Sequence, residues 1–271
     1  MRTLAPLGRR RARVAGADDV GAYRVVHVAD PGAPAPQPGQ FYMLAAAEGW
    51  GAGHDERPYL PRAFSYLRAA DGQLSFMLED VGPGTHRLAQ LTDGDELWLT
   101  GPFGEGFRAP DRGPPARRAL LAGGGVGVPP LSAWAHALAA DGAAVSAVLG
   151  FRDAHHAVGA ELMTAGAVSV ATDDGSVGHH GLVTDLLATA LDDDDHVVVY
   201  ACGPPGMLEA VRALCAARDV PAQLALEAGM ACGFGACYGC VVPLAAGGYI
   251  RLCVDGPVLD ADRLDAVPLH A

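Results

Sequence analysis

The chain contains no lysine, and all 19 of its basic side chains are arginine. Together with 31 aspartate and glutamate residues, they give a formal net charge of −12. A nucleic-acid partner is not expected, because binding to phosphates needs clustered cations. The sequence also lacks any run of about 18 apolar residues, so no membrane-spanning helix is predicted.

An export signal is missing as well. The N-terminus is basic, with Arg2, Arg9, Arg10 and Arg11, but no apolar segment of signal-peptide length follows it. We therefore expect a solvated basic tail over residues 1–12 and a cytoplasmic protein. In a reducing compartment, the six cysteines indicate metal ligands and buried thiols rather than a disulfide framework.

A cysteine-rich stretch near the end of the chain is the most informative feature. Cys232, Cys237 and Cys240 follow the spacing C-x4-C-x2-C, and twelve residues separate Cys240 from Cys253. This spacing is typical of plant-type [2Fe-2S] ferredoxins. The glycines in the loop would let backbone N–H groups turn toward an anionic cluster. A zinc site is the alternative, although structural zinc sites usually pair two short cysteine hairpins and only Cys237 and Cys240 form one here.

Residues 13–110 contain short apolar or alternating runs separated by glycine and proline. Such a pattern indicates antiparallel strands in a sandwich or a barrel. The runs are Tyr23–Val28, Phe41–Ala45, Phe64–Leu67, Leu74–Leu78 and Glu96–Leu99.

Two motifs in this region are candidates for binding an anionic cofactor. Arg62-Ala63-Phe64-Ser65 places a cation, an aromatic ring and a hydroxyl at the start of a strand. Gly82-Pro83-Gly84-Thr85 opens a helical stretch, Thr85–Leu91, where free N–H groups would point at a diphosphate and Thr85 would cap the helix. Each motif alone is a weak signal, because glycine turns before helices are common.

Residues 116–222 alternate predicted strands with helices, which implies a doubly wound parallel sheet. A strand at Ala119–Ala122 runs into Gly123-Gly124-Gly125-Val126-Gly127 and then into a helix at Pro129–Ala140. That order suits a dinucleotide diphosphate, although the loop departs from G-x-G-x-x-G at the third glycine. The later elements are strands at Ala144–Leu149, Ala167–Ala171 and His196–Tyr200, and helices at Thr184–Ala190 and 207–218.

The predicted strand Ala144–Leu149 leads into Gly150-Phe151-Arg152-Asp153, where the adenosine ribose of a dinucleotide is normally recognised. Asp153 would favour a free 2′-hydroxyl and Arg152 a 2′-phosphate, so the sequence leaves NAD and NADP both open. Cys202 lies in the loop after the predicted strand His196–Tyr200, where a nicotinamide could reach it. A simple buried thiol is the alternative for Cys202.

Taken together, these parts resemble the electron-transfer subunits of NAD-dependent dihydroorotate dehydrogenase, a family of ferredoxin-reductase-like flavoproteins. The resemblance covers about residues 13–265, and its most specific element is Met230–Cys240 with Cys253. It implies an antiparallel β-barrel FAD domain over residues 13–110, an α/β doubly wound NAD domain over 116–222 and a small C-terminal [2Fe-2S] module over 223–271.

The resemblance also implies the site residues. FAD would contact Arg62, Ala63, Phe64, Ser65, Met77, Leu78, Glu79, Gly84 and Thr85. NADH would bind Gly123, Gly124, Gly125, Gly127, Asp173, Cys202, Gly203 and Pro204, and the [2Fe-2S] cluster would bind Cys232, Cys237, Cys240 and Cys253. The chain departs from the family pattern at His86, where a basic residue is common, and at Gly229, where arginine is common.

The implied function is electron transfer to NAD+ in pyrimidine synthesis, from a partner FMN-containing dihydroorotate dehydrogenase subunit in a heterotetramer of two copies of each chain. A flavin is needed because a hydride carries two electrons whereas a [2Fe-2S] cluster accepts one. No base or arginine array for dihydroorotate is evident, so the pyrimidine chemistry is expected on the partner. Two alternatives stay open: a subunit of a sulfhydrogenase or ferredoxin:NADP-type complex, and a non-enzymatic binding protein with a structural zinc site.

Overall fold

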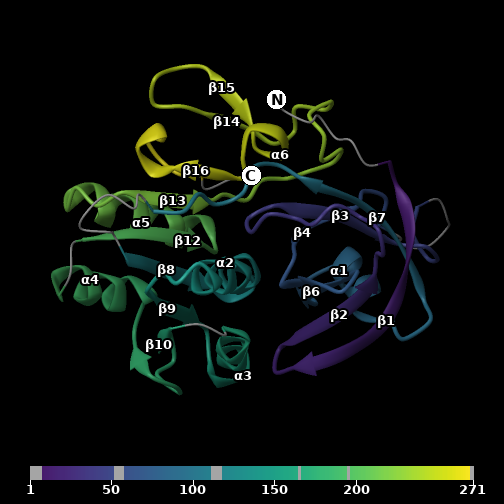
Figure 1. Ribbon diagram of the computed structural model, residues 1–271, viewed down its shortest axis with the longest axis horizontal. Helices are drawn as coiled ribbons and strands as arrows, with labels where there is room; N and C mark the ends of the chain where they lie inside the picture. Colours follow the sequence, from purple (N-terminus) through teal and green to yellow (C-terminus); the bar gives the residue numbers. More distant parts are fainter. Residues whose placement is uncertain (1–7, 52–57, 111–117, 164–165, 194–195, 269–271) are drawn as a thin grey trace.

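The computed structural model describes residues 8–51, 58–110, 118–163, 166–193 and 196–268. They form two sheets side by side and a smaller unit that lies across the ends of both (Figure 1). Within the described residues, no helix has the length and apolar character needed to cross a membrane.

The first sheet is antiparallel and has the strand order β4-β3-β7-β1-β2-β6-β5. Every second residue of β7 is buried, and Leu97 and Leu99 share a core with Phe76 and Leu78 of β6. A short helix, α1 (Pro83–Ala89), follows β6. The strands are β1 (Arg10–Val20), β2 (Tyr23–Ala29), β3 (Phe41–Ala46), β4 (Arg62–Ser65), β5 (Arg68–Ala70), β6 (Gln73–Glu79) and β7 (Glu96–Phe103).

This sheet curls without closing. Its edge strands β4 and β5 are separated in sequence only by Tyr66 and Leu67, which brings the two edges close together. Among the described residues, however, no ladder of hydrogen bonds joins β4 to β5 or β6. The antiparallel architecture is confirmed, and the predicted barrel is open along this seam.

The start of β1 corrects the prediction of a solvated tail. Arg10–Ala12 pair with β7, and the Arg10 guanidinium donates two hydrogen bonds to the buried carboxylate of Asp30. The prediction is therefore wrong for these residues, because alternation of exposed arginines with buried Ala12 and Val14 makes this stretch an amphipathic strand. Residues 1–7 lie outside the described part of the chain.

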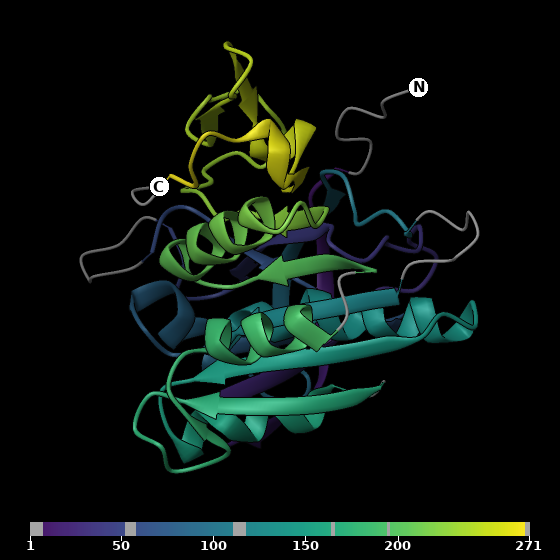
Figure 2. The ribbon, with the colours of Figure 1, turned by 90° about the vertical axis from the view of Figure 1, so that its left-hand side faces the viewer.

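The second sheet has the order β11-β10-β9-β8-β12-β13-β16, and every pair except β13–β16 is parallel. Leu120 and Ala122 of β8 face α4 and α5, whereas Ala119 and Leu121 face α2, so helices cover both faces (Figure 2). The elements are β8 (Arg118–Gly124), α2 (Val128–Ala140), β9 (Val145–Phe151), α3 (Ala154–Ala157), β10 (Ala167–Thr172), β11 (His179–His180), α4 (Val183–Asp193), β12 (Val197–Cys202), α5 (Pro205–Ala217), β13 (Ala222–Ala225) and β16 (Val258–Asp260). The predicted doubly wound sheet is confirmed.

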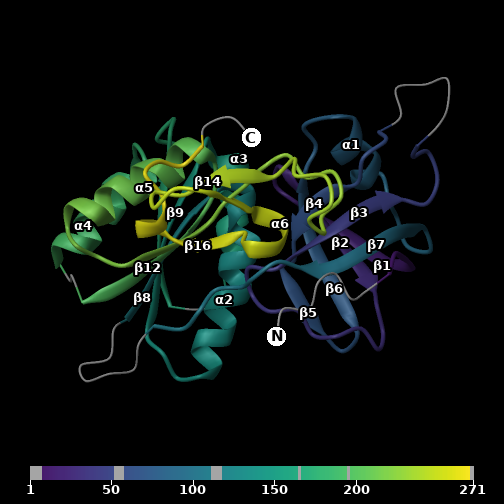
Figure 3. The same cartoon turned by 90° about the horizontal axis from the view of Figure 1, so that it is seen from above.

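The smaller unit contains the cysteine loop, the hairpin of β14 (Val241–Pro243) and β15 (Tyr249–Arg251), and the short helix α6 (Leu252–Asp255). Seen from above, it spans the boundary between the two sheets (Figure 3). It is continuous with the second sheet because β16 pairs with β13. It also touches the first sheet, where Gly233 packs against Met43 and Phe103.

Candidate functional site

A cavity of about 660 Å³ lies between the two sheets and under the segment that leads to the cysteine loop. The first sheet contributes β3, β4, β6 and the start of α1. The second contributes the glycine loop after β8 and the ends of β12 and β13, which are carboxyl ends of parallel strands, where such sheets bind ligands. Of the predicted cofactor residues, the cavity is lined by Arg62, Ala63, Phe64, Ser65, Met77, Glu79, Thr85 and Cys202.

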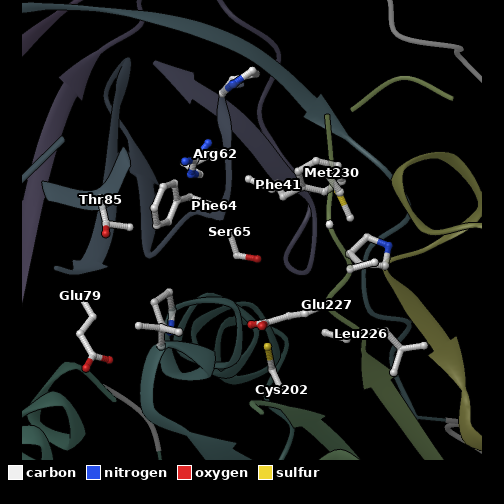
Figure 4. A pocket seen from close by; sticks show the side chains of 18 of the residues that line it. Phe41, Arg62, Phe64, Ser65, Glu79, Thr85, Cys202, Leu226, Glu227 and Met230 are labelled. Atoms are coloured by element: carbon white, nitrogen blue, oxygen red, sulfur yellow. The ribbon is translucent and has the colours of Figure 1, made fainter. Parts of the chain in front are cut away.

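Arg62 and the turn before α1 form one end of the cavity (Figure 4). The Arg62 guanidinium donates to the Leu60 carbonyl at 2.6 Å and lies against Gly84, where a Cβ would come within 2.6 Å of Nε. The Thr85 hydroxyl accepts the N–H groups of Val81 and Gly82 at 2.9 and 3.0 Å. Gly84 therefore makes room for the cation, and Thr85 holds the turn in shape.

The glycine loop after β8 packs directly on the loop after β12. A Cβ at Gly127 would lie 2.1 Å from the Cys202 carbonyl oxygen, and one at Gly124 would lie 2.7 Å from the Met207 sulfur. A Cβ at Gly203 would likewise meet Met207, at 2.6 Å. Only Gly125 of the loop glycines has a positive φ, 51°, with open space around it. Close packing between the two loops thus explains most of these glycines.

Cys202 and Glu227 lie together at the opposite end of the cavity from Arg62 (Figure 4). Burial, and secondly the charge of Glu227, raise the pKa of the Cys202 thiol, so it stays protonated at neutral pH. Desolvation by the surrounding protein also raises the pKa of the Glu227 carboxyl, although the residue keeps an exposed surface in the cavity. Ser65 lines the cavity from β4 on the facing sheet.

Glu227 is a site residue that the sequence analysis missed. It belongs to no motif and precedes the cysteine loop by five residues. The available signal was its position directly after a buried apolar run, Leu224–Leu226. A polar residue at the carboxyl end of a parallel strand is placed for ligand contact.

Some predicted residues lie away from the cavity. Leu78 is 1% exposed and packs into the core of the first sheet, so its side chain faces the other way from that of Met77. Asp173 is exposed after β10 and does not line the cavity. Gly124, Gly127, Gly203 and Pro204 support the cavity wall through the packing between the two loops, and Gly123 packs against the side chains of Leu149 and Leu131.

The four cysteines of the C-terminal unit form two neighbouring pairs. Cys240 and Cys253 are buried with their sulfurs 3.2 Å apart, and Cys232 is hydrogen-bonded with Cys237. Cys253 lies on α6, immediately after β15. In the described residues, no three acidic, histidine or cysteine side chains are grouped around a single metal-ion position.

Backbone N–H groups converge on these sulfurs. Ala236 N donates to Cys232 Sγ at 3.3 Å, Gly239 N to Cys237 Sγ at 3.4 Å and Cys253 N to Cys240 Sγ at 3.5 Å. Burial opposes ionisation of Cys232, but hydrogen bonds from the loop outweigh it and lower the pKa of this thiol to about 7. Two pairs of cysteine sulfurs with N–H donors match the needs of a two-iron cluster.

A second cavity, of about 460 Å³, opens on the other side of the cysteine loop. Its lining includes Cys232, Phe234 and the aromatic rings of Trp50, Trp98 and Phe103. Ala231 lines both this cavity and the larger one. The cysteine loop therefore borders the nucleotide-sized cavity on one side and an aromatic recess on the other.

Two family models match the chain. The model described as the iron-sulfur cluster binding domain of dihydroorotate dehydrogenase B matches residues 227–265, and an oxidoreductase NAD-binding domain matches residues 121–213. The fold is shared with a solved NADH-dependent reduced ferredoxin-NADP oxidoreductase, at 24% identity and a TM-score of 0.79 over 94% of this chain and 90% of that one. Fold and site define a ferredoxin-reductase-like oxidoreductase with an NAD-binding sheet and an iron–sulfur domain.

Two curated relatives narrow this class. The dihydroorotate dehydrogenase B (NAD(+)) electron transfer subunit of Listeria welshimeri is 40% identical over 84% of this chain and 87% of its own length. The subunit of the same name from Bacillus caldolyticus is 41% identical over 84% and 86%. The chain belongs to the family of electron-transfer subunits of dihydroorotate dehydrogenase B. The predicted oxidoreductase class is confirmed, with its FAD, NAD and iron–sulfur cofactors at the level of the family, and the non-enzymatic alternative is wrong.

Proposed function

We propose that this chain carries electrons from an FMN-containing dihydroorotate dehydrogenase subunit to NAD+, through a [2Fe-2S] cluster and FAD, in pyrimidine synthesis. The observation that carries the proposal is the segment Glu227–Cys232, which lines the large cavity at one end and contains Cys232, a proposed cluster ligand, at the other. Six residues thus connect a flavin and nicotinamide site with a cluster site.

In this proposal, FAD occupies the part of the cavity on the first sheet. Arg62 pairs with its diphosphate, the N–H groups at Gly84 and Thr85 face the same phosphates, and Phe64, Ser65 and Met77 border the flavin ring. These residues belong to an FAD domain over residues 13–110, followed by an NAD domain over 116–222 and a cluster module over 223–271. When bound, FAD supplies the conversion between two-electron hydride transfer and one-electron transfer to the cluster.

The chain's own residues shape the nicotinamide end of the cavity. The neutral thiol of Cys202 and the Glu227 carboxyl present polar atoms to a ring that enters between the sheets. The glycine loop and the Cys202–Pro204 loop are closely packed, since Gly127 lies against the Cys202 carbonyl and Gly203 lies against the backbone N of Gly124. They therefore fix the depth to which a nicotinamide enters.

The side chains between the two sites are closely packed. Phe41 lines the large cavity, and its ring centroid lies 5.8 Å from that of Phe103. Phe103 and Met43 in turn contact Gly233, next to Cys232. This packing holds the cluster loop against the first sheet.

The partner subunit is proposed to bind on the face around the cysteine loop. Phe234 and Tyr238 are 48% and 63% exposed there, beside the aromatic recess. Aromatic residues with nearby arginines are typical of binding hot spots, and the Arg9 and Arg251 guanidinium groups lie over Trp98 and Tyr238. An FMN-containing partner and a heterotetramer of two copies of each chain are parts of this proposal.

Reconstitution tests the proposal directly. Anaerobically purified chain, mixed with an FMN-containing dihydroorotate dehydrogenase, is expected to couple dihydroorotate oxidation to NAD+ reduction. Its absorption spectrum is expected to show flavin and iron–sulfur bands. A colourless protein that contains zinc, or one that binds a hydrogenase subunit and ignores the dihydroorotate dehydrogenase, would contradict it.

The fit between Gly84 and Arg62 predicts a selective effect on FAD. Gly84→Ala places a methyl group within 2.6–2.9 Å of the guanidinium, so Arg62 must turn away from the diphosphate. We expect FAD to bind about tenfold more weakly, the loss of about one charge-assisted hydrogen bond, as measured by flavin release on dilution. Gly82→Ala is the matched control, because no atom in the described part of the chain lies within 4 Å of its Cβ position. Equal FAD affinity in the two variants would contradict the proposed role.

Glu227 gives a second test. Glu227→Gln keeps the shape of the side chain and removes its charge, so we expect NADH to reduce the bound flavin about tenfold more slowly while FAD content is unchanged. Stopped-flow absorbance of the flavin measures this rate. Glu161→Gln, an exposed change outside the cavity lining, is expected to leave it unaltered. If the two variants reduce at the same rate, Glu227 has no part in the nicotinamide site.

A further inference from the structure

A charged cluster joins the two sheets at the edge of the large cavity. Arg152, in the loop after β9, forms an ion pair with Glu79 at the end of β6, and Glu79 lines the cavity. His156 of α3 lies beside both, with Nε2 2.7 Å from Arg152 Nη2 and 3.4 Å from Glu79 Oε1. The guanidinium of Arg152 is therefore held by a carboxylate from the opposite sheet.

The surroundings of Arg152 are acidic. Asp153 accepts hydrogen bonds from the His156 backbone and ring at 3.0 and 2.7 Å, and these bonds lower the pKa of its carboxyl. The loop after β10 lies alongside, because Asp173 N donates to Phe151 O and Asp174 N donates to Arg152 O. Hydrogen bonds with Ser176 lower the pKa of Asp174, so this carboxylate is ionised as well.

The position of this cluster relates it to the adenosine half of a dinucleotide. In a parallel sheet with a glycine loop after one strand, the residues at the end of the next strand meet the adenosine ribose. There a carboxylate accepts the 2′-hydroxyl of NAD, whereas an arginine accommodates the 2′-phosphate of NADP. β8 carries the glycine loop, and β9, which is followed by Arg152 and Asp153, is its neighbour.

We propose that Glu79 determines nucleotide specificity by keeping Arg152 from a 2′-phosphate. The ion pair neutralises Arg152 and turns it toward the first sheet, which leaves a ribose end dominated by Asp153, Asp173 and Asp174 and therefore selective for NAD(H) over NADP(H). This inference rests on the proposed NAD site. It assigns the choice between the two nucleotides to a residue of the flavin-binding sheet, far in sequence from the nucleotide motif.

The pair can be opened by a single substitution. The Arg152 side chain is 62% exposed, so the interaction is screened by solvent and the fold does not depend on it. Without Glu79, Arg152 still follows β9, but its guanidinium is no longer drawn toward the first sheet and can turn to meet a phosphate. A guanidinium binds phosphate well because of its planar set of N–H donors.

Binding of two adenosine nucleotides to the FAD-loaded chain tests the proposal by calorimetry. Adenosine 2′,5′-bisphosphate carries the 2′-phosphate, and 5′-AMP lacks it. Glu79→Gln is expected to bind the bisphosphate at least about fivefold more tightly than the wild type, with 5′-AMP affinity within about twofold. The double variant Glu79→Gln/Arg152→Gln is expected to lose this gain. It carries the same change at position 79 as the single variant, but it lacks the guanidinium that would bind the 2′-phosphate.

The outcomes separate the proposal from its alternatives. If Glu79→Gln brings no gain for the bisphosphate, or if the gain persists in the double variant, Arg152 is not the group that Glu79 restrains and the inference is overturned. Should Glu79→Gln fail to fold, Glu79→Asp, whose shorter side chain releases Arg152 with the charge kept, must show a gain for the inference to stand. A wild-type chain that binds neither 5′-AMP nor NADH overturns the proposed NAD site together with the inference, whereas normal 5′-AMP binding without a gain overturns the inference alone.

Discussion

Replacing Cys240 with serine is expected to abolish the iron–sulfur absorption bands while the flavin spectrum remains. Cys240 is 2% exposed, and its sulfur lies 3.2 Å from that of Cys253 and accepts a hydrogen bond from the Cys253 N–H. It is therefore a buried member of one of the two thiol pairs. Loss of outer-shell partners of a metal ligand costs about 10–100-fold, and loss of a buried ligand costs more. We therefore expect electron transfer to the partner subunit to fall by more than about 100-fold.

The flavin half of the protein provides the internal reference for this variant. NADH should still reduce the bound FAD at the wild-type rate, because Cys240 takes no part in the hydrogen bonds made by Arg62 and Thr85. Cys215→Ala is the matched control, since Cys215 is an equally buried thiol on the face of α5 that packs against the second sheet. A Cys240→Ser protein that keeps its cluster, or a Cys215→Ala protein that loses it, would contradict the ligand assignment.

The cysteine loop was predictable because its chemistry is encoded in spacing. Ligands within one loop must sit a fixed number of residues apart, and C-x4-C-x2-C leaves few alternatives. The element that bears Cys253 was less accessible, because α6 is only four residues long and depends on its packing. Propensity is weak over so short a stretch, and tertiary contacts decide its structure.

The two sheets also combine features that local sequence patterns predict with features that depend on tertiary contacts. Strand and helix periods located β2, β3, β6, β7 and the βα units of the second sheet to within a few residues. Local patterns do not predict how edge strands pair. They therefore could not show that the β4–β5 seam is open or that β16 joins the second sheet. Glu227 and the Glu79–Arg152 pair were missed for the same reason, because each acquires its meaning from a residue on another element.

The glycine loop shows how a structure changes the meaning of a motif that the sequence analysis had found. The motif was interpreted as room for a dinucleotide diphosphate, yet only Gly125 faces open space. A Cβ at Gly127 would lie 2.1 Å from the carbonyl oxygen and 2.4 Å from the carbonyl carbon of Cys202, both of them backbone atoms. Backbone cannot rotate away as a side chain does, so a methyl group here must separate the two loops.

Gly127→Ala is therefore expected to damage both stability and nicotinamide binding. Overpacking in a well-packed core costs about 1–3 kcal/mol, and we expect the upper end, a loss of about 3 kcal/mol in the free energy of unfolding measured with urea. NADH-driven flavin reduction should fall by more than about tenfold, because Cys202 moves with its carbonyl. FAD should remain bound, since its proposed contacts lie on the first sheet.

The control for this prediction is another glycine of the same α/β unit. Gly206 lies in the first turn of α5, and no atom of the described residues comes within 4 Å of its Cβ position. Gly206→Ala should leave flavin reduction unchanged and raise the free energy of unfolding by up to about 1 kcal/mol, because alanine loses less backbone entropy on folding. If Gly127→Ala behaves like Gly206→Ala, the contact between the two loops is not what fixes the nicotinamide end of the cavity. If instead only Gly127→Ala fails, the glycines of this motif serve loop packing first and cofactor approach second.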